Sequence, residues 1–152
     1  MQIPKLPIEG SCRCGQTRLK ITAQPMITMA CHCSGCQKMS ASAFSCSAAI
    51  PSQGFEVTAG DPVIGGTHGD DVHHYHCPHC KSWMFSRMTG MEWFVNVRPT
   101  MLDDSSWYAP FAETYTSAKF PWAKTGAVHA YEEFPPMDAY EGLMKDFAEW
   151  KP

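Results

Sequence analysis

Closely spaced cysteines are the residues of this chain with the clearest chemistry. Three stand within six residues and two further pairs flank them, giving Cys12, Cys14, Cys31, Cys33, Cys36, Cys77 and Cys80. Thiols packed this tightly can face one point, and a shared metal ion is the commonest reason for such an arrangement. Cys46 is the only cysteine outside these groups, and its place in an alternating segment predicts a small hydrophobe on a buried strand face.

Disulfides are the alternative, because eight cysteines is an even number and even counts are typical of secreted frameworks. Segment 1–7 has no charged head followed by an apolar run, so we expect neither a signal peptide nor a membrane anchor, and a cytoplasmic protein. Thiols in such a chain stay reduced. Cysteines two apart would also strain the preferred disulfide torsion, whereas a metal ion tolerates close sulfurs. The sequence therefore favours metal binding.

Zinc is the metal that this ligand set favours, because it is redox-inert and takes four tetrahedral thiolate ligands. An iron–sulfur cluster is the weaker alternative. The two outer pairs would form a closed structural site, and the triplet would hold a second zinc ion with one open position. The spacing leaves other arrangements open: His32, His76 or His79 could supply a fourth ligand, or bridging sulfurs could join both metals in one cluster.

Composition narrows the classes of function. At 152 residues and 44% hydrophobic content the chain fits one soluble domain, which we assign to residues 1–152. The net charge is −3 and no run of Lys or Arg occurs, so we expect no nucleic-acid partner and no binding to acidic membranes. No apolar segment approaches the length needed to span a bilayer. Nothing in the pattern fixes an oligomeric state.

The elements that must position the cysteines are mostly β-strands. Thr17, Leu19 and Ile21 alternate with polar residues, which is the period-two pattern of a strand with one solvated face. Further strands are expected at 26–30, 44–50, 55–58, 83–85 and 93–97. In segment 72–76, alternation would send His73 and Tyr75 to one side and His74 and His76 to the other, which favours solvent contact or support of a site over direct ligation.

Two segments predict helix. Residues 37–42 would form one turn directly after the triplet. At the C-terminus, apolar residues recur at helical spacing with charges between them, at Met137, Tyr140, Leu143, Met144, Phe147 and Trp150. We expect this stripe to pack on the chain's own domain rather than to form a dimer face.

Three motifs in order carry a resemblance to a known family. They are Gly10-Ser11-Cys12-Arg13-Cys14-Gly15, Cys31-His32-Cys33-Ser34-Gly35-Cys36 and Cys77-Pro78-His79-Cys80. The pattern resembles the glutathione-dependent formaldehyde-activating family, which also contains the conserved domain of centromere protein V. Weaker matches at Phe44-Ser45, Leu102-Asp103-Asp104 and Pro121-Trp122 extend the likeness over residues 10–123, with a C-terminal wrap and helix left at 124–152.

The resemblance implies an all-β domain with the Mss4-like, or β-tent, fold of antiparallel sheets stapled by zinc. It implies structural zinc at the outer pairs and activity-linked zinc at the triplet. The family reaction joins formaldehyde and glutathione to give S-hydroxymethylglutathione, which in reverse is a carbon–sulfur lyase reaction. This chain departs from the family where Lys81 replaces a glycine after the last cysteine, and where Ser40-Ala41 replaces Ser-Gly after the triplet. Both departures lie beside the expected site and bear on its substrate.

Glutathione carries two carboxylates, so basic residues should hold it, and the candidates are Lys38, Lys81, Arg87 and Arg98. His32 is the least arbitrary choice of general acid or base, because it stands inside the triplet. The rival from another class is a non-catalytic, zinc-stapled module that binds a protein partner and would expose apolar surface. A methionine sulfoxide reductase of related fold is disfavoured, because no cysteine follows Cys80.

Overall fold

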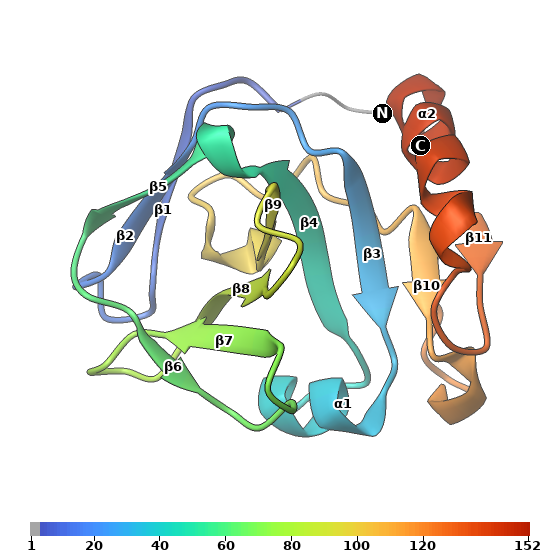
Figure 1. Cartoon of the computed structure of the whole chain (residues 1–152), viewed down its shortest axis with the longest axis horizontal. Helices are drawn as coiled ribbons and strands as arrows, with labels where there is room; N and C mark the ends of the chain where they lie inside the picture. Colours follow the sequence, from blue (N-terminus) through green and yellow to red (C-terminus); the bar gives the residue numbers. More distant parts are fainter. Residues whose placement is uncertain (1–3) are drawn as a thin grey trace.

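The computed structural model describes residues 4–152, which fold into two β-sheets and two short α-helices (Figure 1). The strands are β1 Ile8–Ser11, β2 Arg18–Ile21, β3 Ile27–Cys31, β4 Ser45–Pro51, β5 Phe55–Ala59, β6 Val63–Gly65, β7 Val72–His76, β8 Trp83–Met88, β9 Phe94–Val97, β10 Ala112–Thr114 and β11 His129–Ala130. The helices are α1 Ser34–Ser40 and α2 Tyr140–Glu149, and the 3-10 turns are η1 Ser52–Gly54, η2 Pro99–Met101, η3 Thr116–Ala118 and η4 Met137–Ala139. The expected all-β class with a short C-terminal helix is confirmed.

The smaller sheet has the order β1-β2-β5 and the larger one the order β11-β10-β3-β4-β9-β8-β7-β6. Neighbouring strands are antiparallel except at one edge of the larger sheet, where β10 runs parallel to both β3 and β11. No strand was expected at Ala112–Thr114 or at His129–Ala130, and both segments extend the larger sheet. This edge matters for the site, because the parallel register sets Thr114 beside Cys31.

The chain packs around two groups of buried apolar residues. One lies between the sheets and includes Leu19 and Ile50, both fully buried, together with the side chains of Cys12 and Cys77. The other lies between the larger sheet and α2, where Phe111 packs edge-on against Phe147 with ring centroids 5.5 Å apart. The C-terminal helix therefore docks on its own chain, as its apolar stripe predicts. Among the described residues, no helix has both the length and the apolar character needed to cross a membrane.

The expected C-terminal stripe is correct at its centre and wrong at its start. Leu143 and Phe147 are buried, whereas Met137 is 71% exposed because it lies in η4, before α2 begins.

We expect Phe147→Ala to lower the free energy of unfolding by about 3–4 kcal/mol, because it would leave a buried cavity. Met137→Ala should change it by less than about 0.5 kcal/mol. Urea denaturation of both variants checks this, and equal effects would contradict the packing described.

Candidate metal centre

Four cysteines from two distant turns converge on one point. Cys12 and Cys14 lie in the turn between β1 and β2, and Cys77 and Cys80 in the turn between β7 and β8. Their four Sγ atoms lie within 4.8 Å of one another, with 3.5 Å from Cys12 to Cys14 and 3.7 Å from Cys14 to Cys77. Tetrahedral zinc–thiolate sites have Zn–S bonds of about 2.3 Å, which place the sulfurs about 3.8 Å apart. The cluster has the right donors and spacing for such an ion, and all eight cysteines are free of disulfides.

Hydrogen bonds fix the sulfurs of this cluster. The backbone N–H of Thr17 donates to Cys12 Sγ at 3.3 Å, and the Ser82 hydroxyl lies 3.2 Å from Cys80 Sγ. Such outer contacts orient metal ligands and offset part of their negative charge. Because β1 and β2 belong to the smaller sheet and β7 and β8 to the larger one, an ion held here would join the two sheets.

The turn that carries Cys77 and Cys80 closes with Lys81 in the left-handed region, at φ +62°. Its N–H donates to the Cys77 carbonyl at 3.0 Å, so the turn requires this conformation. The corresponding end of α1 is Ala41, at φ +49°. Both positions are those at which the resemblance leads one to expect glycine. The two departures from the family pattern therefore fall on residues whose backbone favours glycine.

Lys81 allows a direct test of this strain. A side chain in the left-handed region costs about 1–2 kcal/mol of stability. Glycine avoids this cost, but its greater conformational entropy in the unfolded chain offsets part of the gain. We expect Lys81→Gly to be more stable than Lys81→Ala by about 1 kcal/mol, since both remove the lysine chain but only one removes Cβ. Denaturant midpoints of the zinc-loaded proteins measure the difference. A more stable alanine variant would contradict the assigned backbone conformation.

The remaining three clustered cysteines surround the start of α1. Cys31 ends β3, Cys33 is the N-cap of α1, and Cys36 lies in its first turn. Their Sγ atoms also lie within 4.8 Å of one another, and Cys33 Sγ accepts a hydrogen bond from the N–H of Cys36 at 3.3 Å. An N-terminal N–H group favours a thiolate. The predicted helical turn is thus real, but it begins at Ser34 instead of residue 37 because the cap is one of the thiols themselves.

Hydrogen bonds inside the triplet shift the pKa values of two of its thiols in opposite directions. The hydrogen bond from Cys36 lowers the pKa of Cys31 to about 5, with Thr114 and Cys33 also contributing. The same contact with Cys31 raises the pKa of Cys36, and burial adds to this effect. Thiols must lose their protons to ligate a metal ion, and sulfurs packed this closely can exchange them for one cation. Both clusters could hold a metal ion.

No histidine joins either group of thiols among the described residues. His32 in particular turns away from its neighbours: it is fully buried, and its Nε2 donates to Glu113 Oε2 at 2.9 Å. The Glu113 carboxylate also accepts from Lys119 Nζ at 2.7 Å and from the Thr125 hydroxyl at 2.8 Å. His32 is thus a buried anchor of the triplet loop. Sequence reasoning missed Glu113 as its partner, because 81 positions separate the two residues.

Gln37 is a second residue that sequence reasoning missed. Its side-chain amide donates to the carbonyls of His32 at 2.9 Å and Ala118 at 3.1 Å. These bonds tie α1 to η3 and fix the loop that carries the thiols. Its position directly after the last cysteine of the triplet was the only feature of the sequence that could have indicated this role.

The buried carboxylate of Glu113 makes stability depend on pH. Burial acts to raise the pKa of Glu113, but hydrogen bonds from Lys119, Thr125 and His32 outweigh it and lower the pKa below the ordinary 4.5. A lowered carboxyl pKa stabilises the fold above about pH 4.5, and this contribution disappears as pH falls through the folded-state pKa. We expect Glu113→Gln to lose about 1–3 kcal/mol at pH 7. Urea unfolding of both proteins should show a constant gap down to about pH 5.5 and a smaller one below 4.5; a gap that widens in acid would contradict this.

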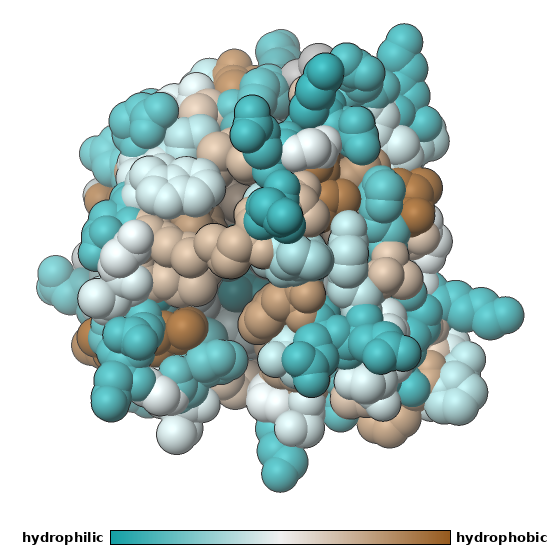
Figure 2. Space-filling view, turned by 45° about the vertical axis from the view of Figure 1, so that its right-hand side comes forward, coloured by the Kyte–Doolittle hydropathy of each residue, from teal (hydrophilic) through white to brown (hydrophobic). Residues whose placement is uncertain are grey.

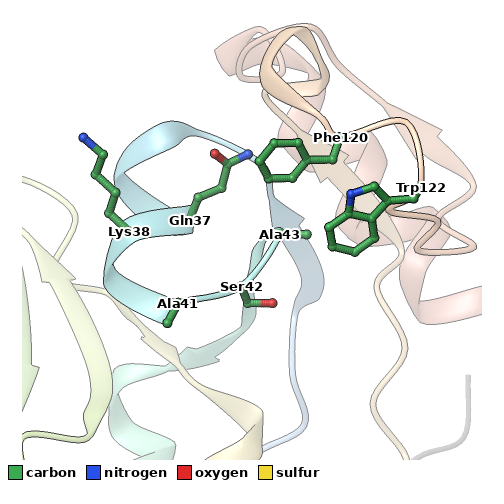
Figure 3. A pocket seen from close by; sticks show the side chains of 7 residues that line it. All are labelled: Gln37, Lys38, Ala41, Ser42, Ala43, Phe120 and Trp122. Atoms are coloured by element: carbon green, nitrogen blue, oxygen red, sulfur yellow. The ribbon is translucent and has the colours of Figure 1, made fainter.

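The four basic residues considered as contacts for the carboxylates of glutathione lie in different parts of the structure. Arg98 is only 9% exposed and lines a cavity of about 390 Å³, and Lys81 lies on the same wall. Lys38 lines a shallower cavity of about 400 Å³, where it extends away from Phe120 and Trp122 (Figure 3). Arg87 lies over the Phe55 and Phe85 rings, with Cζ 5.4 and 5.7 Å from their centroids. Arg98 and Lys81 are therefore the two candidates that share one cavity.

The other residues singled out in the sequence are also placed. His74 is buried and accepts from the Ser86 hydroxyl across 2.7 Å, which fits a supporting role, and burial lowers its pKa to about 4. His73 contacts Thr89 at the surface. Cys46 lies outside both clusters as expected, but it is half-buried on the wall of the Arg98 cavity rather than in the core.

Comparison with protein-family models identifies the family. The family described as glutathione-dependent formaldehyde-activating enzyme matches residues 7–118, which include all seven clustered cysteines. The chain belongs to this family. The resemblance carried by the three motifs is confirmed, and both thiol groups of this family member have the donor types of zinc sites.

Comparison with solved structures supports the fold. The chain is similar to a Rhodobacter sphaeroides protein of known crystal structure, with 16% sequence identity and a TM-score of 0.53. The likeness covers 62% of this chain and 87% of that one. At this identity the comparison bears on the fold alone. A search of curated proteins gave no match.

Proposed function

We propose that this protein is a zinc-dependent carbon–sulfur lyase that forms and splits adducts of a thiol, such as glutathione, with a small aldehyde such as formaldehyde. One observation carries the proposal. In a member of this family, Cys31, Cys33 and Cys36 place three sulfurs within 4.8 Å of one another, and among residues 4–152 no fourth donor joins them. Three protein donors with an open position are typical of metal sites that meet a substrate.

Two zinc ions are proposed per chain. Cys12, Cys14, Cys77 and Cys80 would hold a structural ion, and the triplet would hold the other. An ion with an open position stabilises the ionised form of an incoming thiol. A free thiol is about 3% ionised at neutral pH, so full ionisation gains about 30-fold, or about 2 kcal/mol. Greater acceleration must come from side chains that place the aldehyde against the sulfur.

Side chains around the triplet position the thiol-bearing loop, and none of them is an evident general acid or base. Two hydrogen bonds hold the triplet loop in place: Gln37 donates to the Ala118 carbonyl, and His32 donates to the Glu113 carboxylate. Because the His32 ring is fully buried and bonded to Glu113, we assign it a positioning role and withdraw it as general acid or base. Residues 1–152 would act as one domain, in a reducing compartment such as the cytoplasm where thiolate ligands persist.

Zinc analysis and calorimetry test the proposal. Elemental analysis should give two zinc ions per chain, and titration with glutathione should show binding that competes with other thiols. Exchange spectroscopy by NMR should then show faster formation and breakdown of S-hydroxymethylglutathione than the uncatalysed control. Fully metallated protein that binds no glutathione would defeat the proposed ligand, while a single zinc ion per chain would defeat the division into four and three.

Exposed aromatic residues support a second candidate, a zinc-stapled module that binds a protein partner. Phe120 and Trp122 stack in parallel with centroids 5.7 Å apart and are 42% and 71% exposed. Figure 2 shows one face on which hydrophobic residues are interrupted by polar ones. The double variant Phe120→Ala with Trp122→Ala separates the candidates: unchanged thiol binding and turnover are expected of the lyase. Metallated protein with no thiol binding at all would favour the module.

A further inference from the structure

A cavity of about 390 Å³ has wall residues that neighbour both thiol clusters. Lys81 and Ser82 form part of its wall directly after Cys80. Other parts of the wall belong to the triplet: Ser40, whose hydroxyl donates to the Cys36 carbonyl at 2.6 Å, and Ser45, which pairs with Cys31 across β3 and β4. The cavity therefore begins one helical turn from Cys36.

The charges around this cavity have one sign. Arg98 and Lys81 line it, and no acidic residue does, although the whole chain carries a net charge of −3. Neither cation forms an ion pair with a carboxylate among residues 4–152, where the paired cations are Arg18, His32 and Lys119. A concave surface with low-dielectric walls and one sign of charge concentrates ligands of the opposite sign.

Arg98 is the buried member of the pair, and its hydrogen-bonding capacity is mostly unused. Its Nη1 donates to the Cys46 carbonyl at 3.0 Å and its Nη2 to the Ser86 hydroxyl at 3.3 Å. Its Nε is buried without a partner in the described structure. A guanidinium has five N–H groups, so three remain without an acceptor. Burial lowers the pKa of Arg98 to about 10, which leaves it charged at neutral pH.

The guanidinium is held rigidly. Its Cζ lies 3.9 Å from the centroid of the Trp83 ring, a stacking distance. Trp83 Nε1 also donates to the Ser86 hydroxyl, at 3.1 Å. With two donors on its oxygen, Ser86 must turn its own proton to His74 Nδ1, 2.7 Å away. The network fixes the ring and the hydroxyl that orient Arg98 before any ligand arrives.

We infer that this cavity binds the carboxylate of the ligand whose thiol reaches the Cys31, Cys33 and Cys36 cluster, with Arg98 as its buried anchor and Lys81 at its rim. The inference rests on the proposed function and names the residues that would bind the acid group of the thiol. The thiols of Cys36 and Cys31 favour the charged form of Arg98, but no carboxylate contacts it in the described structure. A planar carboxylate can take two parallel N–H bonds from one guanidinium. Lys81, which has a left-handed backbone conformation, also lines this cavity.

Two small thiols that differ in one group test the inference. Calorimetry on zinc-loaded protein would compare 3-mercaptopropionate with 2-mercaptoethanol, in the native protein and in Arg98→Met. We expect Arg98→Met to lower the affinity for 3-mercaptopropionate at least tenfold and the affinity for 2-mercaptoethanol less than twofold. Lys81→Met, at an exposed position, should weaken the acid alone by about threefold, and it provides a variant that does not disturb the core. Zinc content must stay at the native value in both variants.

Equal weakening of both thiols would overturn the inference, because Arg98 would then act on the metal cluster or the fold and not on the carboxylate. A second measurement needs no thiol: propionate is titrated while the Arg98 Nε–H resonance is followed by NMR. A saturable shift of that resonance supports the anion site even if neither thiol binds, an outcome that would sink only the proposed lyase. No shift on propionate addition overturns the anion site itself.

Discussion

Cys80→Ser is expected to lower the free energy of unfolding by several kcal/mol and to remove one zinc ion per chain. Structural zinc in small domains contributes about 10–16 kcal/mol of apparent binding energy, and that energy is coupled to folding. Here the four sulfurs gather from the turn between β1 and β2 and the turn between β7 and β8, so an ion held by them would link the two sheets and its loss would remove that link. It also leaves Cys12 and Cys77, both buried, as unliganded thiols in the shared core.

Guanidinium denaturation with elemental analysis measures this effect. Cys46→Ser is the matched control, because Cys46 is half-buried and lies outside both clusters. A chelator added to the native protein should reproduce the loss seen with Cys80→Ser, and zinc should reverse it. If Cys80→Ser unfolds at the same denaturant concentration as Cys46→Ser, the four-cysteine group does not hold a structural ion.

Cys33→Ser is expected to abolish thiol binding while leaving the fold intact. Cys33 has two roles: its sulfur caps α1 by accepting a hydrogen bond from the N–H of Cys36, and it is one of the three donors of the triplet. Serine is among the best N-cap residues, so Cys33→Ser keeps the helix cap but loses the thiolate ligand. We expect a fall of more than about 100-fold in glutathione affinity, loss of the second zinc ion, and less than about 1 kcal/mol change in stability.

Calorimetry, zinc analysis and denaturation on the same sample separate these effects. Cys33→Ala is the companion variant: it should lose thiol binding equally and a further ~1 kcal/mol of stability, because alanine cannot cap the helix. Retained glutathione affinity in Cys33→Ser would show that the triplet is not the ligand site. Retained zinc with lost affinity would instead place Cys33 against the thiol rather than the metal.

The motifs that identify the family are local, which is why they could be read from the chain. The pairs Cys12-Arg13-Cys14 and Cys77-Pro78-His79-Cys80 each form one turn, so spacing alone predicts that their sulfurs point the same way. Strand positions were predictable for a similar reason, because Leu19 and Ile21 face a buried side with period two. β10 gave no comparable signal, since it has three residues that are all buried, and a parallel neighbour requires contact with the distant β3.

The roles of polar and charged residues depended on partners that local pattern does not reveal. His32 looked like a candidate acid or base because of its neighbours in sequence, yet Glu113 holds it in the interior. Arg98 was one of four equivalent cations until the packing of β8 and β9 placed it over Trp83, beside the cavity. Burial turns an ordinary surface charge into a specific donor, because the low dielectric strengthens the interaction and removes competing water.

The sequence by itself determined which thiols can gather, that strands carry them, and to which family the chain belongs. Each of these follows from spacing within a few residues. Only the tertiary structure decided that the four-cysteine group connects two sheets, that His32 faces Glu113, and that the buried guanidinium of Arg98 has no carboxylate partner in the described chain. The physical reason is that charge pairing and burial are set by residues brought together across tens of positions, and the free energy of a polar group depends on those neighbours.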